Sequence, residues 1–247
     1  MTARSLERLP TGSAGLDGML RGGLVAGSVG LVQGLAGTGK TTLGLQFLYH
    51  GAAEHGEPGL LITFEQFPRT LYRDALALGW NLRELEDANL LRLVFTSPQV
   101  FLSSLQAPES PISQTIREIG VRRAVIDSVT HFEPLAAFPS ALRSIHNVLV
   151  NGLRREGITG LLISEDRGQD LRHTDPGRLS FIVDAVILLR YVEIDSEMQR
   201  LLAVVKMRGS DHAKEIRRYE IQTGGLVVGQ AFEGREGLLT GSPRRMH

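Results

Sequence analysis

Residues 34–41 have the residue types and spacing that bear most directly on chemistry. Their sequence, Gly-Leu-Ala-Gly-Thr-Gly-Lys-Thr, fits the pattern G-x-x-x-x-G-K-[ST], a loop whose backbone N–H groups surround a phosphate. In that pattern Lys40 reaches the β- and γ-phosphates, and the Thr41 hydroxyl ligates Mg²⁺. Only three of the 27 basic residues are lysines, so a lysine at position 40 indicates a need for its compact charge. The stretch therefore predicts a nucleotide phosphate site with magnesium.

The segments around this loop provide the frame that the motif requires. Residues 30–32 predict a strand before it, and residues 42–48 predict an amphipathic helix after it. The loop then ends on a helix N-terminus, where unpaired N–H groups and the helix dipole favour an anion. The alternative is a glycine-rich turn with a chance Lys-Thr pair, and the strand-loop-helix order argues against it. We expect the phosphates to contact Gly37, Thr38, Gly39, Lys40, Thr41 and Thr42.

Two carboxylates follow predicted strands. Asp127 ends the apolar run 124–126, where a carboxylate can hold a metal-bound water, although an acid there is also a common cap. Glu65 ends the run 60–64, where it could accept a proton from a water that attacks the γ-phosphate. Its alternative role is to favour the start of the next helix. The adjacent Gln66 can orient a water but cannot take its proton.

Two cations near the C-terminal part of the sequence share one strand face. Lys206 and Arg208 are two residues apart on a predicted strand, so their side chains project to the same side. Aimed at a phosphate, they would offset charge that develops in the transition state, whereas the plainer interpretation is a solvated strand face. His212 follows in the turn and by itself indicates only a surface histidine. Residues 166–179 lack aromatics for base stacking, so we favour a solvated loop over a DNA-contacting one.

The composition restricts the classes of protein that fit. With 247 residues, 42% of them hydrophobic, the chain can form one large domain with a substantial core. Zero formal net charge provides no global attraction to nucleic acid or anionic membrane, and the lack of cysteine is compatible with a reducing cytoplasm. Residues 1–9 lack the apolar core of a signal peptide, and no apolar run approaches the length of a membrane span. We therefore expect a cytoplasmic protein.

Predicted strands and helices alternate through most of the chain. Such alternation predicts an α/β fold in which helices cover both faces of a mostly parallel sheet. The ligand of such a sheet lies beyond the carboxyl ends of its strands, where Gly34, Glu65, Asp127 and Ser164 would meet. The predicted strands span 30–32, 60–64, 90–95, 124–126 and 160–163, and the predicted helices span 16–20, 42–48, 68–78, 112–119 and 142–155.

The pattern changes in the last part of the chain. Residues 185–192, 201–207 and 216–221 predict strands joined by short turns, which we interpret as an antiparallel extension of the same sheet. Residues 233–247 lose periodicity and gather Gly, Ser, Pro and Arg, so we expect a flexible tail there. We expect a single domain over residues 1–232.

Five motifs, taken in chain order, resemble the KaiC branch of the RecA-like P-loop ATPases. The likeness runs from about residue 8 to residue 229, and its most specific part is Lys206-Met207-Arg208-Gly209-Ser210-Asp211-His212. The other motifs are Thr11-Gly12 with Gly15-Leu16-Asp17 and Gly22-Gly23-Leu24, then residues 34–42, Thr63-Phe64-Glu65, and Ile126-Asp127-Ser128. The chain is similar to a single-domain member of this branch, because its length suits one such domain.

This resemblance implies ATP and Mg²⁺ bound between neighbouring subunits of a ring, usually a hexamer. One subunit would supply the groups that bind phosphate and metal and activate water, which are Lys40, Thr41, Asp127 and Glu65. The next subunit would supply residues of the last motif, with Lys206 and Arg208 as catalytic cations beside Ser210 and His212. A regulatory or signalling role with a protein partner is also implied.

Two positions depart from the family pattern. The family commonly has two adjacent catalytic glutamates, and here the second is Gln66, which bears on rate and mechanism. In the autophosphorylating half of KaiC a Ser-Thr pair precedes the strand at Asp184, and here that place is Ser180-Phe181. Self-phosphorylation at Ser180 is therefore a hypothesis that rests on a single acceptor.

The leading interpretation is a slow, ring-forming, magnesium-dependent ATPase that acts as a regulatory switch. One alternative is a DNA-dependent recombination or repair motor of the RecA kind, against which the zero net charge argues mildly. Another is a nucleotide-gated binding module that hardly hydrolyses ATP, for which Gln66 is the clue. The turnover rate, the ATP affinity and the response to single-stranded DNA separate these three interpretations.

Overall fold

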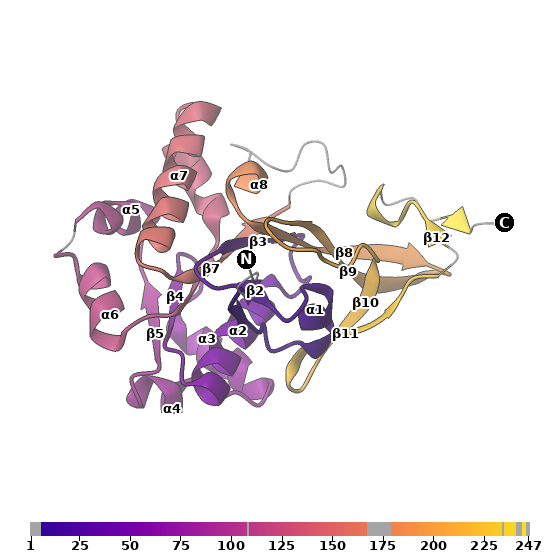
Figure 1. Cartoon of the computed structure of the whole chain (residues 1–247), viewed down its shortest axis with the longest axis horizontal. Helices are drawn as coiled ribbons and strands as arrows, with labels where there is room; N and C mark the ends of the chain where they lie inside the picture. Colours follow the sequence, from indigo (N-terminus) through magenta and orange to yellow (C-terminus); the bar gives the residue numbers. More distant parts are fainter. Residues whose placement is uncertain (1–5, 108, 167–178, 234, 241–243, 246–247) are drawn as a thin grey trace, which may run out of the picture.

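A nine-stranded sheet organises the part of the chain that the computed structural model describes, residues 6–107, 109–166, 179–233, 235–240 and 244–245. The strand order is β11-β10-β9-β8-β3-β7-β6-β4-β5 (Figure 1). The strands from β8 to β5 in that order pair in parallel, and β9, β10 and β11 continue the sheet in antiparallel pairs. The predicted α/β fold with an antiparallel C-terminal extension is confirmed. The strand bounds are β3 (Val29–Gly34), β4 (Gly59–Thr63), β5 (Leu91–Phe95), β6 (Arg123–Asp127), β7 (Thr159–Glu165), β8 (Ala185–Ile194), β9 (Glu197–Met207), β10 (Arg217–Gln222) and β11 (Gly225–Ala231).

Helices cover both faces of the parallel part, each over its own hydrophobic cluster. One face carries α1 (Ala14–Met19), α2 (Lys40–His55), α3 (Pro68–Ala77) and α4 (Leu82–Asp87). The other carries α5 (Pro98–Gln106), α6 (Pro111–Ile119), α7 (Pro139–Arg155), α8 (Leu179–Ile182) and the 3-10 segment η1 (Val129–Leu135). Figure 1 shows the strands β9 to β11 extending on the side away from α5 and α6. Among the described residues, no helix combines the length and the hydropathy that a membrane span requires.

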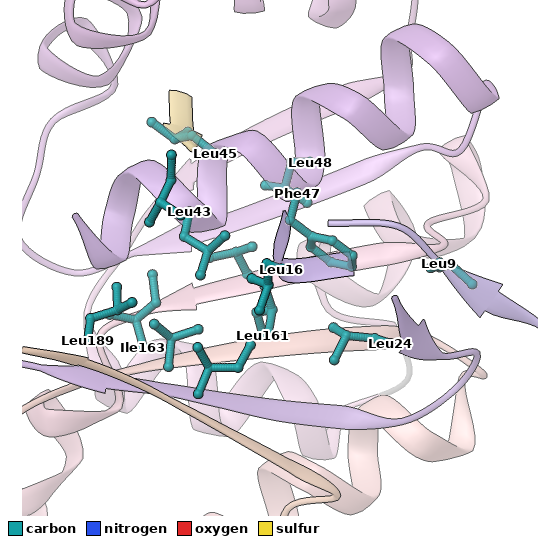
Figure 2. Close-up of a cluster of buried hydrophobic side chains, with 14 of the residues drawn as sticks. Leu9, Leu16, Leu24, Leu43, Leu45, Phe47, Leu48, Leu161, Ile163 and Leu189 are labelled. Atoms are coloured by element: carbon teal, nitrogen blue, oxygen red, sulfur yellow. The ribbon is translucent and has the colours of Figure 1, made fainter. Parts of the chain in front are cut away.

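Helix α2, which follows the phosphate loop, is the centre of the first cluster. Leu43 and Phe47 are one helical turn apart and both are buried. Figure 2 shows these α2 side chains facing Leu161 of β7 and Leu189 of β8, with Leu24 of the N-terminal segment beside them. The apolar residues on either side of the loop thus fix both the helix and the sheet beneath it.

Several details differ from the sequence expectations. Strand β8 pairs in parallel with β3, so the antiparallel extension begins at β9 and not at residue 185. The connection from β7 to β8 is longer than the dozen or so residues that a parallel crossover needs, so this pairing is physically accessible. Helix α5 and strand β11 were not predicted. Helix α5 begins after Ser97, whose side chain caps it by accepting the Val100 N–H. Strand β11 contains two glycines, and several of its residues are exposed, so its sequence gives little indication of a strand.

The chain ends add short pairs to this core. Strands β1 (Arg8–Leu9) and β2 (Leu24–Val25) pair antiparallel, as do β12 (Arg235–Glu236) and β13 (Arg244–Arg245). The 3-10 segment η3 (Leu238–Thr240) packs the buried Leu238 against Val192 and Leu201. The flexibility of the tail and the domain boundary at residue 232 stay predictions.

Candidate nucleotide-binding site

The loop between β3 and α2 keeps its shape through glycines that a larger residue could not replace. Gly39, the residue before α2, has a φ of 88°, and a Cβ added there would lie 2.5 Å from Ile221 Cδ1. A Cβ added at Gly34 would lie 2.3 Å from the Leu189 carbonyl oxygen. At Gly34 the close atom belongs to the backbone of β8, so only glycine permits that approach. At Gly39 the Ile221 side chain could shift, and it is the left-handed φ that favours glycine.

Lys40 is buried at the start of α2 and directs its ammonium into the loop. Its Nζ donates a hydrogen bond of 2.9 Å to the Leu35 carbonyl oxygen. Burial lowers the pKa of Lys40, while the negative charges of Glu165, Asp127 and Asp166 act in the opposite direction. An ammonium has three N–H donors, so the bond to Leu35 leaves donors for a phosphate.

Two tyrosines from the C-terminal strands hold the loop by hydrogen bonds. The Tyr191 hydroxyl of β8 donates to the Gly37 carbonyl at 2.7 Å, and the Tyr219 hydroxyl of β10 donates to the Thr38 carbonyl. The Thr38 side chain is buried and donates to the Leu35 carbonyl at 2.8 Å, so Thr38 offers its backbone to a ligand. Hydrogen bonds within the chain therefore hold the loop from two strands.

A hydroxyl and a carboxylate meet where a magnesium ion would bind. Thr41 Oγ1, in the first turn of α2, donates to Asp127 Oδ2 at the end of β6 over 2.6 Å. Burial raises the pKa of Asp127, and the Thr41 hydrogen bond and the Lys40 charge oppose that effect. Both ligands are hard oxygen atoms of the kind that Mg²⁺ prefers. The residues present therefore fit a magnesium ion held by Thr41 and Asp127.

These groups line a cavity of about 360 Å³ at the carboxyl ends of four parallel strands. The ends of β3, β4, β6 and β7 lie together, as expected. At the end of β7 it is Glu165, and not the expected Ser164, that lines the cavity. The lining comprises Ala36, Gly37, Gly39, Lys40, Thr41, Thr42, Thr63, Glu65, Gln66, Asp127, Ser128, Glu165 and Ile221. The predicted loop residues and both predicted carboxylates thus lie in or around one site.

Glu65 stands at the rim of this cavity. Its side chain is 74% exposed, and its Oε2 lies 3.5 Å from Nε2 of His131 in η1. Water can therefore reach the Glu65 carboxylate, as a group that takes a proton from water requires. The backbone of the neighbouring Gln66 is held by Thr63, whose Oγ1 accepts the Gln66 N–H at 3.3 Å.

Lys206 and Arg208 lie toward the opposite end of the sheet from the phosphate loop of their own chain. Lys206 pairs with Val186 near the start of β8, whereas Gly34 pairs with Leu189 farther along the same strand. Because β9 runs antiparallel to β8, the residues after Lys206 extend away from the loop. The structure therefore does not bring these cations to the cavity of the same chain.

Both cations contact α8 instead. Lys206 Nζ donates to the carbonyl oxygens of Ser180 and Val183 at 2.6 and 2.7 Å. Arg208 donates to the carbonyl of Phe181 in the same short helix. The two side chains satisfy carbonyl groups that a helix C-terminus leaves without intrahelical partners. Ser180, the hypothetical phosphate acceptor, accordingly lies at this end of the sheet.

Ser210 and His212 face their own chain. Arg8 donates to Ser210 Oγ, so this hydroxyl is held against the N-terminal segment. His212 is buried, with Nδ1 2.9 Å from the Ala213 carbonyl oxygen and Nε2 3.0 Å from Lys214 Nζ. The expectation of a lone surface histidine is wrong, and a contact of either residue with nucleotide stays a prediction.

The sequence analysis missed several residues around the cavity and the loop. Glu165 ends β7 as Asp127 ends β6, so the same rule about strand ends could have found it. The others, which are His131, Tyr191, Tyr219 and Ile221, had no local signal because tertiary packing alone brings them to the site. Of residues 166–179, which were expected to form a solvated loop, 167–178 lie outside the described residues. Asp166, just before them, is buried and pairs with Arg190 at 2.9 Å.

Comparison with known proteins agrees with this geometry. A family model described as "ATPase: KaiC" matches residues 9–233. The chain is 35% identical over 233 residues to a circadian clock oscillator protein KaiC from Prochlorococcus marinus, which covers 90% of this chain and 45% of that protein. It is 32% identical over 246 residues to circadian clock protein KaiC3 of Synechocystis, which covers 96% of this chain and 46% of that protein. The chain thus spans about half the length of the curated relatives it matches.

A solved structure has the same fold. The crystal structure of a KaiC-like protein from the hyperthermophilic archaeon Pyrococcus horikoshii superimposes with a TM-score of 0.81 at 30% sequence identity. The match covers 92% of this chain and 100% of the archaeal chain. The structural similarity therefore extends over the whole archaeal chain and most of this one.

Proposed function

The chain belongs to the KaiC family of ATPases, and we propose that it binds ATP with Mg²⁺ and hydrolyses it slowly at a site shared between copies in a ring. The observation that carries the proposal is the gathering of Lys40, Thr41 and Asp127 around one cavity at the carboxyl edge of the sheet. The ATPase would serve as a regulatory switch in the cytoplasm and act on a protein partner, in keeping with relatives named as circadian clock proteins.

Each residue at the cavity has a task in phosphoryl transfer to water. Lys40 and the loop N–H groups would bind the β- and γ-phosphates. Thr41 and Asp127 would hold Mg²⁺, which when bound neutralises charge on the phosphate oxygens. Glu65 would take a proton from the water whose oxygen bonds to the γ-phosphorus, while the bond from that phosphorus to the β–γ bridging oxygen breaks. His131, 3.5 Å from Glu65, would orient that carboxylate.

The position of Lys206 and Arg208 supports a site that two copies share. Both lie toward the sheet edge opposite their own phosphate loop, so a nucleotide that they contact would belong to a neighbouring copy. An interface between two different edges of a chain is heterologous, and its repetition closes into a ring or continues as a filament. A closed ring, six-membered as the family resemblance implies, is the form we propose.

Mixing two inactive variants tests the shared site. Lys40→Ala removes the charge that binds phosphate and should abolish ATP binding, whereas Arg208→Ala should spare ATP binding more than hydrolysis. In a mixed assembly, the intact loop of an Arg208→Ala subunit can meet the intact Arg208 of a Lys40→Ala subunit, so part of the ATPase activity should return. Light scattering would verify that the mixture assembles. Assembly without recovery of turnover would argue against the shared site.

Self-phosphorylation at Ser180 is the second part of the proposal. Because Ser180 lies with Lys206 toward the edge away from its own phosphate loop, transfer would occur between copies. The test incubates Lys40→Ala and Ser180→Ala chains together with Mg-ATP and maps the phosphopeptides. Phosphate should appear on the Lys40→Ala chain. An unmodified Ser180 in both the mixture and the wild-type protein would reject self-phosphorylation.

A nucleotide-gated binding module is the second candidate function, and Gln66 favours it because an amide cannot act as a base beside Glu65. Phosphate release and ATP affinity measured on one preparation separate the two candidates. Micromolar ATP binding without phosphate release would select the module. A many-fold rise in turnover with single-stranded DNA would instead indicate a RecA-type motor.

A further inference from the structure

The last two turns of α2 carry a second group of side chains with metal-ligand chemistry. His50, Glu54 and His55 offer two imidazoles and a carboxylate, with one ligand atom from each within 4.8 Å of the others. The helix begins at Lys40 and ends at His55, so His50 and His55 lie about 15 and 22 Å along α2 from its first residue at the phosphate site. It is therefore separate from the cavity where we propose that ATP binds.

The hydrogen bonds within the group fix the protons on one ring. Nδ1 of His50 lies 2.9 Å from Glu54 Oε1, and because an ionised carboxylate only accepts, Nδ1 carries the hydrogen. Nε2 of a neutral His50 then presents a lone pair. It faces Nε2 of His55 across 3.3 Å, a separation that either a hydrogen carried by His55 Nε2 or a cation bound to both nitrogens can occupy.

The spacing of the two nitrogens fits a tetrahedral metal ion. Nitrogens bound to zinc at about 2.0–2.1 Å in tetrahedral geometry lie roughly 3.3 Å apart. Metal-ligating histidines usually donate their other ring N–H to a carboxylate, which is what His50 does toward Glu54. Imidazole suits the borderline transition metals zinc, copper and nickel and not magnesium or calcium.

We propose that His50 and His55 bind a zinc-class divalent transition metal through their Nε2 atoms, with Glu54 positioning His50 and water completing the coordination. His50 is half-buried, while Glu54 and His55 are exposed, so a metal ion can enter from solvent. The partial negative charge at the C-terminus of α2 and the Asp17 carboxylate, which interacts electrostatically with His50, both favour a cation there. The metal would clamp the last turn of the helix whose first turn holds the nucleotide.

Zinc binding by the full chain tests the proposal. Zn²⁺ is titrated in competition with a chromophoric chelator, in millimolar Mg²⁺ that occupies the hard-oxygen site at Thr41 and Asp127. One zinc ion should bind per chain. The substitutions His55→Ala and His50→Ala should each lower the zinc affinity at least about tenfold. His55 is exposed at the end of the helix, so His55→Ala should not impair folding. Co²⁺ should give visible absorption bands that both variants lose.

A matched histidine control distinguishes this site from the nucleotide cavity. His131→Ala removes a histidine beside Glu65 and should leave zinc affinity unchanged. Zinc that is lost on His131→Ala but kept in the His50→Ala/His55→Ala double variant would overturn the proposal. Equal zinc affinity of the double variant and the parent chain would overturn it as well.

The role of Glu54 has its own readout. Glu54→Ala should weaken zinc binding by about 10- to 100-fold, as expected for a carboxylate that orients a metal-binding histidine. Glu54→Gln keeps an oxygen that accepts the His50 Nδ1–H, so it should restore much of that loss. If Gln is as weak as Ala, Glu54 is a direct metal ligand and not a positioning residue.

Discussion

The Thr41 hydroxyl donates a 2.6 Å hydrogen bond to Asp127 Oδ2, which joins the first turn of α2 to the carboxyl end of β6. This bond brings to one point the two oxygens that would hold Mg²⁺. A bound Mg²⁺ would replace the hydrogen bond. Burial, which raises the pKa of Asp127, would oppose the charged form of the carboxyl that binds the metal.

Asp127→Asn should stabilise the metal-free protein while weakening its response to Mg²⁺. Burial raises the pKa of Asp127, so the charged form is disfavoured in the folded state, and a neutral amide removes that cost. The melting temperature without Mg²⁺ should rise, and the apparent Mg²⁺ affinity in the presence of ATP should fall by about 10- to 100-fold. Thermal melts with and without Mg-ATP measure both effects. A lower melting temperature of the metal-free variant would contradict this explanation.

Mg²⁺ binding should release a proton at pH values near or below the raised pKa of Asp127. The folded pKa of Asp127 lies above the ordinary value of 3.8, so as the pH falls through the raised pKa the carboxylate is protonated and Mg²⁺ affinity is lost. For the metal-free protein the sign is opposite: the contribution of Asp127 to stability is present below 3.8 and is lost as the pH rises through the folded pKa. Titration calorimetry in two buffers of different ionisation enthalpy measures the proton release. Asp127→Asn is the control and should release none from this site.

The two tyrosines that hold the phosphate loop should differ in their contribution to stability. Tyr219→Phe leaves the Thr38 carbonyl without its buried partner, which should cost about 1–3 kcal/mol of the free energy of unfolding. Tyr191→Phe removes a more exposed bond to the Gly37 carbonyl, which should cost about 0.5–1.5 kcal/mol. Urea unfolding measures both costs, and ATP affinity should fall in both variants because the loop loses preorganisation. A larger loss of unfolding free energy for Tyr191→Phe than for Tyr219→Phe would contradict this prediction.

Substitution of Arg123 should lower the stability of the fold more than most substitutions outside the site. Its side chain is fully buried, pairs with Glu57 at 2.5 Å, and donates to the carbonyls of Pro10 and Phe47. Arg123→Ala leaves Glu57 without its partner, so unfolding free energy should fall by about 3–5 kcal/mol. The adjacent Arg122 is the matched control. It pairs with Glu7 on the surface at 3.0 Å, and Arg122→Ala should cost about 1 kcal/mol or less.

Much of the site could be predicted because its central residues are consecutive or follow strand ends. The loop at residues 34–41 makes its phosphate site from adjacent backbone groups, so its spacing alone carries the chemistry. Glu65 and Asp127 were found because parallel strands of one sheet end at a common edge. The alternation of strands and helices predicted that sheet, and the structure has it.

The remaining features depend on contacts between residues far apart in the chain. Tyr219 contacts Thr38 from 181 positions away, a contact set by the antiparallel register of β9 and β10 and by no local pattern. The register of β8 and β9 also decides that Lys206 holds α8 and lies away from its own phosphate loop. The phosphate loop could thus be predicted from the sequence, because its chemistry depends on consecutive residues. Strand pairing, which responds to packing across the whole sheet, decided which distant side chains support the loop and which lie toward the other end of the sheet.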